Sequence, residues 1–142
     1  MNENELKTEL TVEASINNLE KVTSFVNDKL EENECPVKVQ MQIDIAIDEI
    51  FSNIARYAYS PEIGMVTIQM EVTKQPPEVC ITFIDSGIPY NPLLQTEPDT
   101  SLSAEERQLG GLGIFLVRKS MDDVIYQYKE GNNILKLKKL LQ

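Results

Sequence analysis

The chain has 142 residues, 23 acidic and 13 basic, and its net charge of −10 argues against nucleic acid or an anionic membrane as a direct partner. It contains no histidine, which excludes histidine-based metal sites, serine–histidine catalytic pairs and a phosphoacceptor histidine. The length predicts one domain, residues 1–142. Two isolated cysteines, no apolar run of membrane-spanning length and no signal-peptide pattern predict a soluble cytoplasmic protein with free thiols.

The first part of the chain predicts one short strand followed by two helices. Residues 6–12 alternate weakly and indicate a strand, after which Ser15 can cap a helix that runs to about residue 32. Pro36 suits the first turn of the next helix. That helix is the longest one predicted, because apolar residues recur at 3.6-residue spacing from about Val37 to Tyr59.

The remainder of the chain is rich in predicted strands. Residues 65–72 alternate, and residues 79–85 are almost entirely apolar, as in a strand at the centre of a sheet. Residues 86–110 contain three prolines and no sustained period, which predicts a lid or binding loop. The last predicted elements are a helix over about 111–121 and a hairpin of strands 123–129 and 134–140 around a turn at 130–133.

Because the predicted strands cluster in pairs rather than alternating with helices, their order favours an α+β fold. We expect a two-layer sandwich, in which about three helices cover one face of a mixed, mainly antiparallel sheet. The loop at about 86–110 would act as a lid on this sandwich.

Glu49 and Asn53 form the first candidate site, one helical turn apart. With Ser52 and Arg56 they fall opposite the apolar stripe of the long helix. A solvated helix face explains this pattern without any function. As a site, the amide oxygen could ligate a hydrated Mg2+ on a polyphosphate, and the carboxylate could orient or deprotonate a nucleophile.

Asp85 and Gly87 form the second candidate, at the exit of the apolar strand. An ordinary turn accounts for both residues, since Asp and Gly are common in turns. Alternatively, Gly87 lets the backbone approach a ligand closely, and the Asp85 carboxylate accepts a hydrogen bond from the exocyclic amine of a base.

Three glycines in four residues, at positions 110, 111 and 113, form the third candidate. Each glycine costs a helix about 0.8–1 kcal/mol relative to alanine, yet here they open one. Unobstructed N–H groups at a helix N-terminus bind phosphate, although a hinge for the preceding loop is an alternative. The Gly-Lys-Ser/Thr run of a Walker A loop is absent, and no strand leads directly into the glycines as in a dinucleotide-binding motif.

Taken in order, the three candidates resemble the GHKL ATPase superfamily, and in detail they are similar to its anti-sigma-factor serine/threonine kinase branch. The resemblance covers nearly the whole chain. Its matching segments are Asp48-Glu49-Ile50-Phe51-Ser52-Asn53 with Ala58-Tyr59, then Asp85-Ser86-Gly87-Ile88-Pro89-Tyr90-Asn91-Pro92, then Gly110-Gly111-Leu112-Gly113-Ile114 leading to Met121-Asp122.

The resemblance implies a Bergerat fold that holds ATP between helices and sheet under a mobile lid. It implies Glu49 as general base on a substrate serine, Asn53 as Mg2+ ligand and Asp85 as adenine reader. One departure is Tyr57, at a position near the end of the first motif where the branch often has a histidine. The other implied nucleotide contacts are Gly87, Gly110, Gly111, Leu112 and Gly113.

The resemblance also implies partners. Branch members phosphorylate a small anti-anti-sigma (STAS-like) protein and sequester a sigma factor, often as homodimers, but the spread of acidic charge here indicates no sigma-binding surface. An ATP-gated protein-binding regulator without kinase activity is the main alternative. The catalytic half of a histidine kinase is disfavoured, because the chain lacks both a histidine and a helical-hairpin dimerisation segment, and a structural domain with incidental glycines is the remaining possibility.

Overall fold

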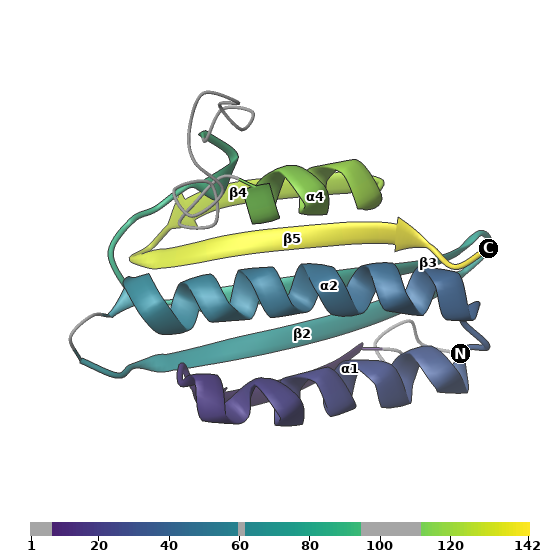
Figure 1. Cartoon of the computed structure of the whole chain (residues 1–142), viewed down its shortest axis with the longest axis horizontal. Coiled ribbons are helices and arrows are strands. Elements are labelled where there is room, and N and C mark those ends of the chain that lie inside the picture. The colour runs from purple at the N-terminus through teal and green to yellow at the C-terminus, as the bar shows by residue number, and fades with distance from the viewer. Residues whose placement is uncertain (1–6, 60–61, 95–111) are drawn as a thin grey trace.

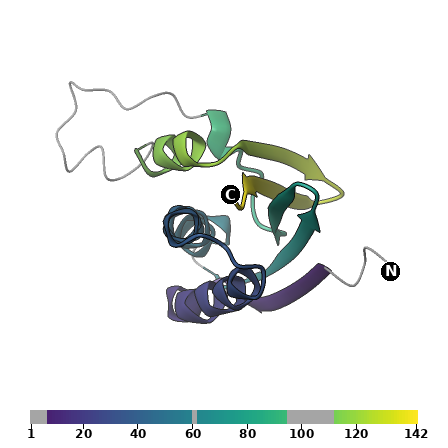
Figure 2. The ribbon, with the colours of Figure 1, turned by 90° about the vertical axis from the view of Figure 1, so that its right-hand side faces the viewer.

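The protein is a two-layer α+β sandwich in the computed structural model, which describes residues 7–59, 62–94 and 112–142. Helices cover one face of a five-stranded sheet of order β1-β2-β3-β5-β4, and every neighbouring pair of strands is antiparallel (Figures 1 and 2). The strands are β1 (Lys7–Glu13), β2 (Met65–Lys74), β3 (Pro77–Asp85), β4 (Asp123–Lys129) and β5 (Asn132–Leu140). The helices are α1 (Leu19–Glu32), α2 (Val37–Asn53) and α4 (Leu112–Ser120), with short helical turns η2 (Ile16–Asn18), η3 (Ile54–Ala58) and η4 (Pro92–Leu94).

This architecture confirms the fold class expected from the order of the elements. β3 lies at the centre of the sheet, between β2 and β5, as its apolar composition predicted. Of the expected lid, residues 86–94 follow β3, and the remainder lies outside the described residues. In the part of the chain that the structure describes, no helix is long and apolar enough to cross a membrane.

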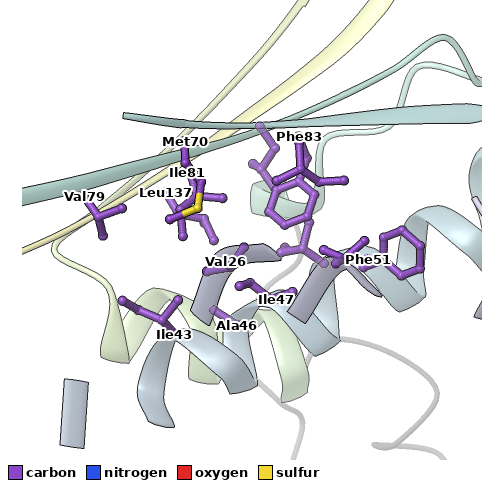
Figure 3. Packing of buried hydrophobic residues seen from close by; sticks show 14 of the residues in the cluster. Val26, Ile43, Ala46, Ile47, Phe51, Met70, Val79, Ile81, Phe83 and Leu137 are labelled. Carbon is purple, nitrogen blue, oxygen red and sulfur yellow. The ribbon is translucent and has the colours of Figure 1, made fainter. Parts of the chain in front are cut away.

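The core lies between α2 and the sheet. α2 occupies the middle of the helix layer, with α1 and α4 on either side (Figure 1). Its apolar stripe includes Ile43, Ile47 and Phe51, and all three side chains are fully buried. They point toward side chains of the central strands such as Met70 and Phe83 (Figure 3). Burial of this stripe fixes which face of α2 the sheet covers, and so where its polar residues lie.

The end of α2 departs from the continuous helix expected through Tyr59. The α-helix stops at Asn53, and residues 54–58 form a π-helix, η3. Ser52 was expected on the solvated face but is only 6% exposed, and its hydroxyl donates to Asp48 Oδ1 at 3.1 Å. A small hydroxyl satisfied within its own helix can be buried at little cost, which the pattern of residue types does not reveal.

Turn and cap residues fix the ends of other elements. Ser15 caps η2, which leads directly into α1, and its Oγ accepts a hydrogen bond from Asn17 N at 3.3 Å. Glu130 and Gly131 both have positive φ, 53° and 82°, as in the two-residue turn that suits a tight hairpin. The turn is therefore shorter than the predicted 130–133, and residues 132 and 133 belong to β5.

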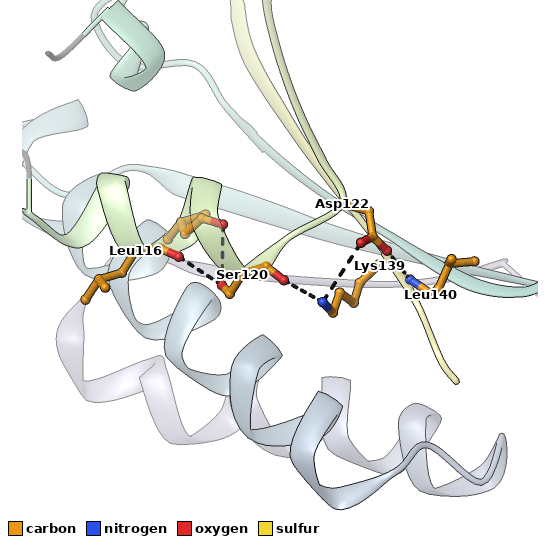
Figure 4. Close-up of polar contacts among 6 residues, drawn as sticks. Leu116, Ser120, Asp122, Lys139 and Leu140 are labelled. Carbon is orange, nitrogen blue, oxygen red and sulfur yellow. Dashed lines mark hydrogen bonds and ion pairs between the residues drawn. The ribbon is translucent and has the colours of Figure 1, made fainter. Parts of the chain in front are cut away.

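Lys139 fastens the C-terminal end of α4 to the sheet (Figure 4). Its Nζ donates to the carbonyl oxygen of Ser120 at 2.6 Å and lies 4.0 Å from Asp122. Asp122 in turn accepts a hydrogen bond from Leu140 N at 2.6 Å. A cation at a helix C-terminus satisfies a free carbonyl and complements the helix dipole, so these contacts hold α4 in place from its last turn.

Candidate functional site

A cavity of about 290 Å³ opens between the C-terminal part of α2, η3 and the strands β3, β4 and β5. Its polar lining residues include a carboxylate and two amides: Asp85 from β3, Asn53 from α2 and Asn133 from β5. An apolar wall with a few convergent polar groups is the usual form of a small-molecule site. The wall is formed mainly by Ile50, Ile54, Tyr57, Phe83, Pro92 and Leu135.

Asp85 is the polar centre of one end of this cavity. It is the last residue of β3 and is 5% exposed. Its Oδ1 accepts hydrogen bonds from Gly87 N and from Asn133 Nδ2, both at 2.9 Å. Within the described residues both bonds end on Oδ1, so Oδ2 is the acceptor that remains for the amine of a ligand.

Asn133 holds Asp85 in place and ties three further groups to it. Its Nδ2 also donates to the carbonyl of Ile88 at 2.8 Å, and its Oδ1 accepts from Tyr90 N at 3.1 Å. The same Oδ1 accepts a short hydrogen bond from the Tyr126 hydroxyl. Burial, with the Asp85 carboxylate nearby, raises the pKa of Tyr126, so its hydroxyl keeps the proton that it donates.

The π-helix η3 forms the opposite wall of this end. A π-turn is rare and is found most often at functional sites. Here the carbonyl of Ala58 accepts a hydrogen bond from Ile88 N at 2.9 Å. A Cβ added at Gly87 would lie 2.2 Å from that carbonyl oxygen, so the segment after β3 can approach η3 this closely only with glycine at position 87.

Tyr59 ties the same region to β2. Its hydroxyl donates to the carbonyl of Met65 at 2.6 Å and accepts a hydrogen bond from Ser86 N at 2.7 Å. A Cβ added at Gly64 would lie 2.3 Å from the Tyr59 ring, so Gly64 leaves room for it. The end of η3, the start of β2 and the exit of β3 are therefore held together next to Asp85.

Glu49 and Asn53 mark the other end of the site. Asn53 Nδ2 donates to Glu49 Oε2 at 2.8 Å, as expected of side chains one helical turn apart. Because Asn53 uses its amide nitrogen, its Oδ1 has no partner among the described residues and can serve as an oxygen ligand. A carboxylate and an amide oxygen suit Mg2+, which prefers oxygen ligands and keeps several waters.

Gly113 brings the start of α4 against this pair. A Cβ added at Gly113 would lie 2.1 Å from Glu49 Oε1, so any larger residue there would displace the carboxylate from its present position. Free N–H groups at a helix N-terminus attract phosphate. The helix start, the carboxylate and the amide therefore lie together beside the cavity.

The structure places the predicted residues in two adjoining groups. Glu49, Asn53 and Gly113 form one, Asp85 and Gly87 form the other, and Asn53 and Asp85 line the same cavity. Leu112 is the first residue of α4, whereas Gly110 and Gly111 lie outside the described residues.

Sequence analysis missed Asn133 and Tyr126, which complete the Asp85 end. Asn133 was assigned to the hairpin turn. Along β5, Asn133 lies on the same face of the sheet as Leu135 and Leu137, and that face points toward the core. A polar residue in phase with core residues is the signal that could have identified it.

The chain belongs to the family described as the histidine kinase-like ATPase domain, which residues 12–139 match. This membership confirms the superfamily resemblance drawn from the three motifs. The family is an ATPase family, so its nucleotide is ATP.

Its relatives include three proteins named as protein kinases. The serine/threonine-protein kinase BtrW of Bordetella bronchiseptica is 28% identical over 100 residues, 70% of each chain. The serine-protein kinase RsbW of Bacillus mycoides is 30% identical over 66% of this chain, and RsbW of Listeria monocytogenes is 30% identical over 68%. The matches span 60% and 63% of these two RsbW chains. The relatives of this chain therefore include named serine and serine/threonine-protein kinases, which agrees with the kinase branch that the motifs resemble.

Two solved structures share the fold. The structure of the RsbU and RsbW domains of a Mycobacterium tuberculosis protein superposes with a TM-score of 0.68 at 16% identity, over 95% of this chain and 32% of that one. The SiaB–SiaC complex of Pseudomonas aeruginosa superposes with a TM-score of 0.58 at 13% identity, over 92% and 89%. At such identities the likeness supports the sandwich fold alone.

Proposed function

We propose that this protein is an ATP-dependent serine/threonine kinase of the anti-sigma type, which phosphorylates a serine on a small anti-anti-sigma (STAS-like) protein. One observation carries the proposal: the hydrogen-bonded Glu49–Asn53 pair lies against Gly113 at the start of α4 and adjoins the cavity that contains Asp85. In this arrangement Glu49 would serve as the base, Asn53 as an oxygen ligand and the start of α4 as the phosphate-binding site, beside a cavity that could hold a purine.

The Asp85 end of the cavity would bind adenine. Oδ2 of Asp85 accepts a hydrogen bond from the exocyclic amine, while Asn133 and Gly87 N hold the carboxylate in orientation through Oδ1. The apolar wall excludes water around the base, which strengthens this hydrogen bond. Gly87 lets the segment after β3 pack against the Ala58 carbonyl of η3, which borders this end of the cavity.

The Glu49 end would carry out the transfer. The triphosphate would extend toward the start of α4, where Gly113 would lie beside the phosphates. Glu49 would accept the proton of the substrate hydroxyl as the hydroxyl oxygen bonds to the γ-phosphorus, while the bond from that phosphorus to the β,γ-bridging oxygen breaks and ADP leaves. Asn53 fixes the position of the carboxylate through its amide. Mg2+ held through Asn53 Oδ1 would neutralise charge on the phosphates; the rest of phosphoryl transfer is mostly positioning.

The partner follows from the relatives. BtrW and RsbW are named as serine/threonine-protein and serine-protein kinases, which supports a protein as the acceptor. Sequestration of a sigma factor and a homodimer extend the proposal by the same analogy.

Transfer of label from γ-labelled ATP to purified STAS-domain proteins of the same genome tests the proposal on wild type and Glu49→Gln. The glutamine keeps the size of the side chain and an oxygen for Asn53 but takes up no proton. We expect transfer to fall by about 10²-fold or more, while ATP affinity in calorimetry stays within about threefold.

Glu20→Gln is the matched control, because Glu20 is an exposed glutamate in the first turn of α1. It should transfer phosphate as wild type does. Equal transfer by wild type and Glu49→Gln removes the proposed role of Glu49. ATP binding by wild type without transfer to any of the STAS-domain proteins favours the nucleotide-gated regulator instead.

A further inference from the structure

A row of exposed apolar side chains runs along α2 on the side away from the sheet. Val37 is 72% exposed, Met41 60% and Ile45 57%. Residues four apart lie one above another on a helix, so the three form a continuous ridge. We call these three residues the α2 ridge.

The fold does not require the α2 ridge to be apolar. The side of α2 that packs on the sheet uses other residues, among them Ile43 and Ile47, which are fully buried. Valine and isoleucine are also poorer helix formers than alanine, lysine or glutamate, so Val37 and Ile45 weaken an exposed helix face. Single exposed apolar residues are ordinary, but contiguous ones mark interaction surfaces.

The α2 ridge leads directly into the proposed catalytic end. The next residue in the same row after Ile45 is Glu49, and the one after that is Asn53. Four residues of a helix rise about 6 Å, so along the helix axis Ile45 lies about 6 Å from Glu49 and Val37 lies about 18 Å from it. Residues spaced four apart shift gradually around the helix axis, so the row turns toward α4 as it continues. At Glu49 the side chain lies against Gly113 of α4.

No residue of the α2 ridge lines the nucleotide cavity. Protein docking on the ridge and nucleotide binding in the cavity therefore use different faces of the same helix. They meet only at Glu49 and Asn53, where an acceptor hydroxyl and the γ-phosphate would have to come together.

The border of the α2 ridge is acidic. Asp48 is exposed and Asp44 partly exposed, and Lys38 is the one basic residue of α2. At the start of the ridge Glu34 is also exposed. A complementary partner surface therefore combines an apolar centre with lysine or arginine at its edge.

We propose that the α2 ridge is the docking surface for the protein that presents the acceptor serine, and that this protein meets it with an apolar patch bordered by basic side chains. The proposal rests on the proposed kinase function and deepens it, because it names the surface that positions the acceptor. The acceptor lies along α2 with its serine at the Glu49 end.

Kinetics with Met41→Glu tests this surface, with the STAS-domain protein that wild type phosphorylates as the probe. Met41 lies at the middle of the ridge, and a glutamate there adds a charge without affecting the cavity. We expect the KM for the acceptor to rise about tenfold or more, while the Kd for ATP is unchanged. Because salt screens exposed charges, increasing salt should raise the acceptor KM of wild type. The same increase in salt should raise the acceptor KM of Asp48→Asn by a smaller factor, since that variant lacks one of the acidic groups.

Two variants serve as controls. Met41→Leu keeps an apolar side chain at the same position and should retain the wild-type acceptor KM. Ile125→Glu introduces the same charge on β4, at a residue 42% exposed and paired with Lys136 across the strands. It should also behave as wild type, because β4 belongs to the sheet layer and not to the helix layer.

The outcomes separate the two proposals. An unchanged acceptor KM in Met41→Glu overturns the docking surface and leaves the kinase intact. Absence of transfer from wild type to every STAS-domain protein overturns the kinase and the docking surface together. If sedimentation shows that Met41→Glu breaks a homodimer while the acceptor KM is kept, the ridge binds a second copy of this chain and the acceptor proposal is wrong.

Discussion

At the scale of single residues, the Asp85 end of the cavity depends on Asn133. Its amide makes four hydrogen bonds, to Asp85, Ile88, Tyr90 and Tyr126, and these partners come from β3, the segment after it and β4. A buried polar group left without its partner costs about 1–3 kcal/mol. Removal of this one side chain therefore affects both the stability of the fold and the orientation of the Asp85 carboxylate.

We predict that Asn133→Ala lowers the free energy of unfolding by about 2–3 kcal/mol in urea and weakens ATP binding about tenfold or more in calorimetry. Asn132→Ala is the matched control, because among the described residues the Asn132 side chain bonds only Ser86, at the surface, and the change should alter stability by about 0.5 kcal/mol or less. Wild-type ATP affinity in Asn133→Ala would exclude Asn133 from the site.

Gly113 offers a residue change that separates activity from stability. Alanine favours a helix by about 0.8–1 kcal/mol over glycine, but its Cβ here requires the Glu49 carboxylate to move and release Asn53. We predict that Gly113→Ala leaves the thermal midpoint within a few degrees of wild type and lowers phosphate transfer about tenfold or more. Lys119→Ala, exposed on the same helix, should transfer normally. Full activity in Gly113→Ala would show that Glu49 can work from another position.

At the scale of elements, periodicity identified the strands and helices whose side chains alternate simply between core and solvent. The stripe of α2 predicted that helix, and the apolar run of β3 predicted both the strand and its central place in the sheet. The π-turn at residues 54–58 was not predicted, because the apolar period of α2 continues through it and its Ala58 carbonyl bonds Ile88, a residue distant in sequence. Asn133 was missed because its partners come from other strands.

The contact between α1 and α2 contains a carboxyl that is poorly placed for its charge. Asp44 Oδ1 is buried and has no hydrogen-bond partner in the described part of the chain, and Asn27 Oδ1 on α1 is in the same condition. Burial raises the pKa of Asp44, and its interaction with the Asn27 side chain partly opposes the rise. The folded state therefore binds the Asp44 proton more tightly than the unfolded state does.

It follows that the Asp44 contribution to stability is lost as pH rises from about 3.9, the ordinary pKa of aspartate, through the raised folded value. We predict that Asp44→Asn has a higher thermal midpoint than wild type at pH 7, and that the difference disappears near pH 3.5, as followed by circular dichroism. Asp28→Asn, exposed on α1, should show no such dependence on pH. An equal difference at both pH values would mean that charge is not the cause.

At the scale of the whole molecule, the cavity depends on both layers of the sandwich. Asn53 comes from the helix layer, whereas Asp85 and Asn133 come from the sheet. A nucleotide in this cavity would contact both layers, so it should bind the folded protein and not the unfolded chain. Binding to the folded state alone stabilises it by mass action, so affinity and base specificity can be read from unfolding.

We predict that ATP with Mg2+ at 100 times its Kd stabilises wild type by about 2.7 kcal/mol, which raises the thermal midpoint by several degrees. Asp85→Asn should show almost no shift at the same concentration, because it replaces acceptor oxygen at the end of β3 with a donor. GTP is the matched ligand control: its guanine presents a carbonyl where adenine presents an amine, and Asp85 Oδ2 cannot donate to it. An equal shift with GTP, or a retained shift in Asp85→Asn, would mean that the base lies elsewhere in the cavity and that the hydrogen-bonded group around Asp85 serves the fold alone.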